Sequence, residues 1–233
     1  MARTERLTLE GPEGGLEAVL TTPEQPTFRA VVAHPHPLYG GSMENDVVRE
    51  ATRTLLKAEG EVLRFNFRGV AASAGVYDGC KERYDLQAAL RSMAARDDGL
   101  PTVLAAYSFG SVMALALLGD SAVQTEALFA GLLCLAPPLT HYDFTAVHSA
   151  PVPLGIVYGT ADALTPEAQV RTLVDARGVL PTFSRAVENT GHDLGTVSGP
   201  AQLRPVFREA TSWLLKELGI RAHASPPAPL QAS

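Results

Sequence analysis

The chain has 233 residues, of which 46% are hydrophobic, and it carries a formal net charge of −6 at pH 7. This length fits one α/β domain better than two small ones, and the apolar content is sufficient for a large core. The negative charge and the absence of Lys/Arg clusters argue against binding to nucleic acid or to an anionic membrane surface. Small neutral molecules remain compatible with this composition.

The cysteines and the N-terminal stretch both favour a soluble cytoplasmic protein. Cys80 and Cys134 fall in different expected elements and have neither metal-ligand nor CxxC spacing, so we expect reduced thiols. The stretch MARTERLTLEGPEGG lacks the apolar segment of a signal peptide. Apolar runs are also shorter than the roughly 20 residues that a transmembrane helix requires.

Short apolar runs alternate with helical periodicities along the first half of the chain. Strands are expected at 6–10 and 16–20, and the intervening GPEGG suits a hairpin turn. The uniformly apolar run 30–33 predicts a strand that is buried on both faces. Next come the loop HPHPLYGGS, an amphipathic helix that begins near Met43 and ends before Gly60, a strand at 62–67 and a helix at about 81–95.

The same alternation continues through the second half. We expect strands at 103–106, 131–136, 154–158 and 182–187, and helices directly after Ser108, at about 167–176 and at about 201–218. Thr165 should cap the second of these helices, with Pro166 at its first position. The alternation predicts an α/β fold, a mostly parallel sheet with helices on both faces, in a single domain over 1–220. Residues 221–233, rich in Pro and Ala, should form a disordered tail.

The segment PTVLAAYSFGSVMALALL, residues 101–118, combines an apolar strand, a sharp turn and a helix. Ser108 lies at the turn, and the small residues Ala106 and Gly110 allow strand and helix to approach closely. Such a turn lifts the hydroxyl above the carboxyl edge of the sheet, where the free helix amides and the positive end of the helix dipole point. Ser108 therefore suits a nucleophile, and a simple helix N-cap is the alternative.

A nucleophilic serine needs a base and an acid that orients the base. Ligands of such sheets bind at the carboxyl ends of the strands, and this rule selects Asp162 in YGTAD and His192 in NTGHD. The order Ser, Asp, His is the order used by the α/β-hydrolase fold. Alone, each of the two could be an ordinary loop residue. The alternatives are Asp143 and Asp193 for the acid and His141 and His148 for the base.

Five segments carry a resemblance to a known family. They are VVAHPHPLYGGSMENDVV, RFNFRGV, AYSFGS, LAPPLTHYDF and VYGTAD. Together they resemble the α/β-hydrolase superfamily, in particular a group of small bacterial serine hydrolases without a cap domain, similar to dienelactone hydrolases and simple esterases. The resemblance covers about residues 11–218, and HPHPLYGG with RFNFRG is its most specific part. Ala106 stands at the first glycine of GxSxG, and Ala71 and Ala72 stand where the group more often has glycine.

By position, the resemblance implies Ser108 as nucleophile, His192 as general base and acid, and Asp162 as its orienting partner. It also implies that the backbone N–H of Phe109 is one oxyanion donor and that the loop after the strand at 30–33 supplies the other. Leu38 is the expected second donor. Pro35 and Pro37 have no N–H, and the amides of His36 and Tyr39 are the alternatives.

The expected site is open or covered by short loops, because the segment between Pro138 and the strand at 154–158 is too short for a helical lid. The side chains expected to line it are His36, Tyr39, Tyr107, Leu139, Tyr142 and Phe144. This lining suits the ester of a small or medium acyl group, cleaved through an acyl-enzyme. Thioester, lactone and amide cleavage and acyl transfer use the same residues, and a non-catalytic ligand-binding protein of the same fold is the alternative of another class.

Two further polar groups are expected to be structural. Arg68 should form an ion pair at a strand exit, with Asp85 as a candidate partner. His34 and His36 alternate with proline in one loop and lack the further ligands that a metal site requires. We therefore expect neither metal nor cofactor, and a monomer or homodimer acting on a small acyl substrate.

Overall fold

The computed structural model describes residues 2–96, 98–120 and 128–220, so the expected tail at 221–233 lies outside the described residues. The strands are β1 (Arg3–Gly11), β2 (Gly14–Thr22), β3 (Phe28–Ala33), β4 (Gly60–Phe65), β5 (Thr102–Tyr107), β6 (Gly131–Leu135), β7 (Leu154–Gly159) and β8 (Thr182–Val187). The helices are α1 (Asp46–Lys57), α2 (Glu82–Ala94), α3 (Phe109–Leu118), α4 (Glu167–Ala176) and α5 (Leu203–Glu217). Short 3-10 turns are η1 (Pro37–Tyr39), η3 (Thr145–Val147) and η4 (Thr196–Ser198).

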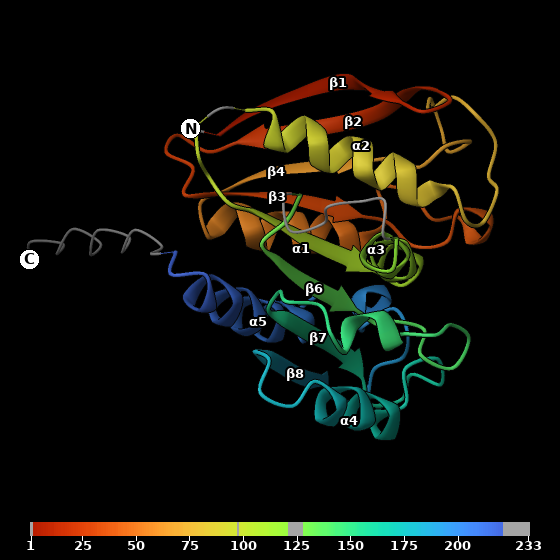
Figure 1. Ribbon diagram of the computed structural model, residues 1–233, viewed down its shortest axis with the longest axis vertical. Helices are drawn as coiled ribbons and strands as arrows, with labels where there is room; N and C mark the ends of the chain where they lie inside the picture. The colour runs from red at the N-terminus through yellow and green to blue at the C-terminus, as the bar shows by residue number, and fades with distance from the viewer. Residues whose placement is uncertain (1, 97, 121–127, 221–233) are drawn as a thin grey trace, which may run out of the picture.

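The eight strands form one sheet in the order β1-β2-β4-β3-β5-β6-β7-β8 (Figure 1). Neighbouring strands from β4 to β8 pair in parallel, whereas the β1–β2 hairpin adds to β4 in the antiparallel sense. From β3 the chain crosses to β4 on one side and later to β5 on the other, so the strand order reverses between β3 and β5. Such a switch point is where ligands bind in open α/β sheets.

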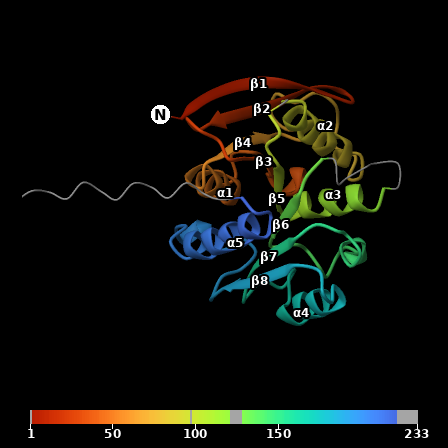
Figure 2. The ribbon, with the colours of Figure 1, turned by 60° about the vertical axis from the view of Figure 1, so that its left-hand side comes forward.

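Helices cover both faces of the sheet, which confirms the predicted layer arrangement. α1 and α5 lie on one face, and α2, α3 and α4 lie on the other (Figure 2). The strand β3 shows why: Ala30 and Val32 pack into the cluster under α1 and α5, whereas Val31 and Ala33 pack into the cluster under α2 and α3. Burial on both faces accounts for the apolar sequence of residues 30–33. The preceding residue of β3, Arg29, is also buried and is paired with Glu61 and Asp98.

Two helix starts differ from the sequence expectation. α1 begins at Asp46 rather than near Met43, because the side chain of Asn45 accepts the Val47 N–H at 2.9 Å and caps the helix there. α4 begins at Glu167 with Pro166 as its N-cap residue, so Thr165 does not cap it. The Thr165 hydroxyl instead lies in the interior, where tertiary contacts override the local preference.

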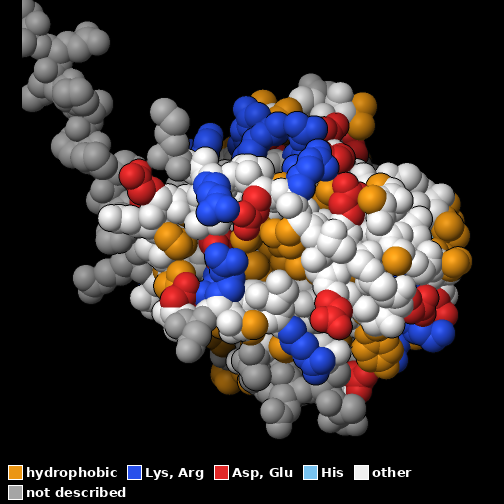
Figure 3. All heavy atoms as spheres, turned by 90° about the horizontal axis from the view of Figure 1, so that it is seen from above, with side chains coloured by type: hydrophobic (Ala, Val, Ile, Leu, Met, Phe, Trp, Pro, Cys, Tyr) orange, Lys and Arg blue, Asp and Glu red, His pale blue; other side chains and the backbone are white. Residues whose placement is uncertain are grey.

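The edge formed by β1 is protected by charge. Arg3 pairs with Glu5 on this strand, and Arg6 pairs with Glu17 on β2. Figure 3, which views the molecule from above, shows Lys/Arg and Asp/Glu side chains interspersed over the visible face. Charged side chains on an edge strand disfavour pairing with a second chain.

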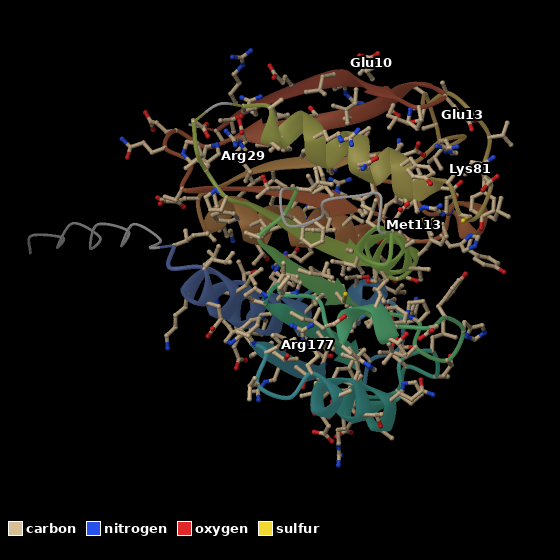
Figure 4. All side chains as sticks on the ribbon, in the orientation of Figure 1. Glu10, Glu13, Arg29, Lys81, Met113 and Arg177 are labelled. Carbon is tan, nitrogen blue, oxygen red and sulfur yellow. The ribbon has the colours of Figure 1, made fainter. Side chains whose placement is uncertain are left out.

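The expected ion pair at the exit of β4 is present and buried. Arg68 donates to both carboxylate oxygens of Asp85, at 2.6 and 2.9 Å, and its backbone N–H donates to the same carboxylate at 3.0 Å. The guanidinium also contacts Glu13 in the β1–β2 turn at 2.6 Å. Glu13 and Lys81 lie at the end of the sheet opposite to Arg29 (Figure 4). This network fixes the loop between β4 and α2.

Within the described ranges, no helix combines the length and apolar character that a bilayer span requires, and no cluster of His, Cys, Asp and Glu has the form of a metal site. Cys80 is exposed and Cys134 is buried, and both are free thiols. Burial raises the pKa of the Cys134 thiol to about 12, so this side chain acts as a small apolar group in the core.

Candidate active site

Ser108 occupies the sharp turn between β5 and α3 with φ 51° and ψ −114°, a strained conformation for a residue with a side chain. Its N–H donates to the carbonyl of Leu135 at 2.9 Å. The turn also requires Gly110, since a Cβ there would lie 2.8 Å from the carbonyl oxygen of Ala33. Ser108 stands at the N-cap position of α3, but its side chain makes no capping hydrogen bond. The N-cap alternative for its hydroxyl therefore does not hold.

The hydroxyl of Ser108 instead contacts a histidine. Its Oγ lies 2.8 Å from Nε2 of His192, and Nδ1 of the same ring lies 2.9 Å from Oδ2 of Asp162. A carboxylate can only accept, so Nδ1–H donates to Asp162 and leaves the Nε2 lone pair free for the serine proton. The three side chains thus form one continuous hydrogen-bonded chain.

Asp162 is 5% exposed and has every oxygen engaged. Besides His192, its Oδ2 accepts from the Thr165 hydroxyl at 2.9 Å, and its Oδ1 accepts from the Leu164 N–H at 2.8 Å. Burial disfavours the charged carboxylate, but the hydrogen bond and charge of His192, with these two donors, outweigh it and hold the pKa of Asp162 below its ordinary value. Asp162 is therefore a carboxylate at neutral pH.

The loop that carries His192 is attached to β5 and β7. The Tyr107 hydroxyl donates to the carbonyl of His192 at 3.0 Å, and burial raises the pKa of this phenol. Gly159, at the end of β7, allows close contact, because a Cβ there would lie 2.3 Å from the carbonyl oxygen of Thr190. These contacts set the position of the imidazole ring above the serine.

None of the alternative acids and bases belongs to this hydrogen-bonded chain. Asp143 accepts from the N–H and hydroxyl of Thr145, and Asp193 accepts from the Val197 N–H. The ring of His141 lies beside the Thr140 hydroxyl at 2.8 Å. The backbone N–H of His148 belongs to the η3 turn.

His36 and Phe109 line the cleft together with Ser108, and the backbone amides of both, that of Phe109 at the first position of α3, have no acceptor among the described residues. The expected donor Leu38 is a different case, since its N–H donates to Nδ1 of His36 at 3.2 Å and its side chain is exposed. The Tyr39 N–H donates to the carbonyl of His36 at 3.1 Å. The Leu38 amide is therefore already bonded within the turn, whereas the His36 amide is free to bind a ligand.

The peptide unit that carries the His36 N–H is held by a buried neighbour. His34 is fully buried, and its Nδ1–H donates to the carbonyl of Pro35 at 2.6 Å, while its Nε2 accepts from the Phe67 N–H at 3.0 Å. A trans peptide directs its C=O and N–H in opposite directions, so fixing the Pro35 oxygen also fixes the His36 N–H. Gly41 closes over this peptide, because a Cβ there would lie 2.1 Å from the Pro35 oxygen.

An open cleft of about 520 Å³ lies above Ser108. Of the expected lining residues, it contains His36, Tyr39, Tyr107 and Tyr142. Leu139 and Phe144 are absent from the lining, because Phe144 is buried in the core and Leu139 packs against that core. The lining residues that sequence analysis missed as pocket residues are Pro35, Asn45, Pro138, His141 and Leu164. Most of them follow strand ends, which is the signal that could have identified them.

Aromatic side chains and the histidines His36, His141 and His192 line the cleft. No Lys, Arg, Asp or Glu is among the described residues that line it. A larger groove of about 680 Å³ lies along β8 and α5, lined by residues that include Ser184, Arg185 and Glu188. It contains none of the three hydrogen-bonded side chains described above, so we place the chemistry in the smaller cleft.

The chain matches no protein-family model. It is 34% identical over 178 residues to an uncharacterized protein of Rickettsia prowazekii (strain Madrid E), covering 73% of this chain and 72% of the relative. Among solved structures it resembles an α/β serine hydrolase homologue from Coxiella burnetii (31% identity, 88% of this chain and 96% of that chain, TM-score 0.77). It also resembles an α/β serine hydrolase without a lid from Xanthomonas campestris (28% identity, 96% and 97%, TM-score 0.78). The chain therefore belongs to the α/β-hydrolase superfamily, among the members that lack a lid.

Proposed function

We propose that the protein is a serine hydrolase that cleaves carboxylic esters of small to medium, uncharged acyl groups. The observation that carries this proposal is the continuous chain of hydrogen bonds from Ser108 through His192 to Asp162 at the base of an open cleft. The names of the similar solved structures, an α/β serine hydrolase homologue and an α/β serine hydrolase without a lid, support hydrolysis as the reaction class.

In the proposed reaction, Ser108 Oγ attacks the carbonyl carbon of the ester while Nε2 of His192 takes the hydroxyl proton. Asp162 holds the Nδ1–H tautomer and stabilises the imidazolium that forms. The tetrahedral intermediate then collapses, and the proton on Nε2 passes to the leaving alkoxide. A water molecule, deprotonated by the same ring, attacks the acyl-enzyme, releases the carboxylic acid and restores Ser108.

The negative charge on the tetrahedral intermediate requires donors at fixed positions. The N–H groups of Phe109 and His36 supply them in this proposal, because both residues line the cleft with Ser108 and neither amide has an acceptor among the described residues. The N-terminal end of α3 adds a favourable dipole. Each such donor is typically worth about 3 kcal/mol of the barrier.

The cleft supports an uncharged substrate. Aromatic rings of Tyr39, Tyr107 and Tyr142 line it, and a negatively charged acyl group would find no cation among the described lining residues. Its volume of about 520 Å³ lies in the range of small-molecule sites. A substrate whose acyl group carries a carboxylate should therefore react poorly.

A fluorophosphonate probe tests the proposal directly. We expect stoichiometric labelling of Ser108, located by mass spectrometry, and loss of labelling in His192→Ala. Wild-type protein that folds normally but is not labelled would refute the activated serine and favour the ligand-binding alternative.

A substrate series then tests the acyl preference. p-Nitrophenyl esters from acetate to dodecanoate report the chain length, and a succinate monoester of the same alcohol tests the exclusion of charge. Matched acyl thioesters, a lactone and an amide separate the alternative leaving groups. A kcat/KM for the succinate ester equal to that for butyrate would contradict the proposed neutral cleft.

A further inference from the structure

His36 and Phe109, the two proposed oxyanion donors, also pack their side chains together. The rings of His36 and Phe109 lie 4.9 Å apart between centroids, and Tyr77 packs against both, at 5.1 Å from His36 and 6.0 Å from Phe109. Tyr77 is not a lining residue of the cleft. It belongs to the loop between β4 and α2, far from His36 and Phe109 in sequence.

The His36 ring is hydrogen-bonded at both nitrogens. Its Nδ1 accepts the Leu38 N–H at 3.2 Å, so this nitrogen carries no proton. The proton lies on Nε2, which donates to the hydroxyl of Tyr77 at 2.9 Å. Burial lowers the pKa of the His36 ring, against the charge of Glu82, so the ring is neutral at pH 7. Turn η1 is thereby tied to Tyr77 through one imidazole.

Tyr77 is itself firmly attached. The loop that carries it contains Arg68, whose buried ion pair with Asp85 joins it to α2. The next residue after Tyr77, Asp78, donates its N–H to the buried carboxylate of Glu82 at 2.7 Å. Gly79 passes so close that a Cβ there would lie 3.0 Å from the Tyr77 hydroxyl oxygen. The Tyr77 phenol is therefore held in place, and it contacts His36 in the loop after β3. The residues that follow His36 in that loop, Leu38 and Tyr39, are exposed.

We propose that Tyr77 is a positioning residue of the oxyanion hole: its hydroxyl holds the His36 ring, and through it holds the His36 N–H beside that of Phe109. This inference rests on the proposed hydrolase function. Without the hydroxyl, the ring loses its Nε2 partner and turns more freely, so the amide spends less time in the position that stabilises the intermediate. Tyr77 itself does not line the cleft, so the other contacts with the ground-state substrate are unchanged.

Tyr77→Phe is the test, because it keeps the ring contacts and removes one hydrogen bond. We expect kcat for a p-nitrophenyl ester to fall about five- to tenfold, the effect of one net hydrogen bond, with KM unchanged. Tyr84→Phe is the matched control. The Tyr84 hydroxyl accepts from Arg83 on α2, outside the cleft, and its removal should leave kcat unchanged.

A trifluoromethyl ketone gives a second readout that a merely structural role would not move. Addition of Ser108 Oγ to the ketone carbon turns the carbonyl oxygen into an oxyanion and transfers the serine proton to His192. In Tyr77→Phe its inhibition constant should rise by the same factor by which kcat/KM falls. Active-site titration of Ser108 gives the concentration of active protein used to calculate kcat and the inhibition constant. The melting temperature shows that the variant is folded.

The outcomes separate the two proposals. If wild-type Ser108 is not labelled by a fluorophosphonate, the hydrolase function is refuted and the role of Tyr77 with it. If wild-type protein is active and Tyr77→Phe keeps the wild-type kcat, raises only KM, or keeps the wild-type inhibition constant, Tyr77 does not position the oxyanion hole and the hydrolase function stands.

Discussion

Acidification should destabilise the folded protein through the buried ring of His34. This side chain is fully buried, and its Nε2 accepts the Phe67 N–H while its Nδ1–H donates to Pro35. A proton on Nε2 would face the donor of Phe67 and leave that N–H without an acceptor. Burial accordingly lowers the pKa of His34 from 6.5 to about 4.

The sign and size of this effect of pH on stability follow from the two pKa values of His34, 6.5 in the unfolded chain and about 4 in the folded protein. Between pH 6.5 and about 4 the unfolded chain binds a proton at His34 and the folded chain does not, so the free energy of unfolding falls as the pH falls. The two pKa values differ by about 2.5, and one pKa unit corresponds to about 1.4 kcal/mol. His34 should therefore cost about 3 kcal/mol of stability between pH 7 and pH 4, with no further loss below its folded pKa.

Urea unfolding of wild type and His34→Gln across this pH range measures the effect. A glutamine can accept from Phe67 and donate to Pro35 but does not titrate. The Asp and Glu side chains are the same in both proteins, so they contribute equally to the pH dependence of the two stabilities. The single tryptophan, Trp213, which stacks on Phe183, reports unfolding by fluorescence. The wild type should lose about 3 kcal/mol more than the variant on acidification. Parallel pH dependences in the two proteins would refute the buried neutral histidine.

Three further substitutions test the site. Ser108→Ala should lower ester turnover at least about 10⁴-fold at an unchanged melting temperature, and retained turnover would exclude the proposed nucleophile. Thr165→Val removes a buried donor to Asp162, and we expect a loss of about 1–3 kcal/mol in urea unfolding together with a lower kcat; unchanged stability would show that water replaces the hydroxyl. Gly41→Ala places a methyl group against the Pro35 oxygen, so kcat should fall about 10²-fold, measured with active-site titration, and wild-type kcat would mean that this peptide does not position a donor.

The three hydrogen-bonded side chains could be predicted from the sequence because each follows the end of a strand. Ser108 comes directly after β5, whereas Asp162 and His192 lie in the loops after β7 and β8. Parallel strands bring their carboxyl ends to one edge of the sheet. The chain order of the three residues added a second, independent constraint. No knowledge of side-chain contacts was needed.

The second amide was different, because sequence identifies which residues have an N–H but not which N–H is already bonded. Leu38 and His36 both qualify in sequence, and only the fold shows that the Leu38 amide is used by the ring of His36. Thr165 illustrates the same limit. It has the sequence position of a helix cap, but its hydroxyl binds Asp162 and the carbonyl of Pro137. Phe144, expected in the pocket, is instead buried in the hydrophobic core.

The position of β8 has a consequence for how the enzyme would fail on heating. In the described part of the chain β8 pairs with β7 alone, and of its residues only Val187 is buried. Outer strands with few buried side chains open at lower free energy than the centre of a sheet, and the loop that carries His192 follows this strand. On heating, activity should therefore be lost when β8 and the His192 loop unfold locally, while the central strands remain folded. A covalent adduct on Ser108 that also contacts His192 would stabilise the His192 loop and β8. Compared with the free protein, the adduct should therefore show its largest decrease in amide hydrogen exchange in β8.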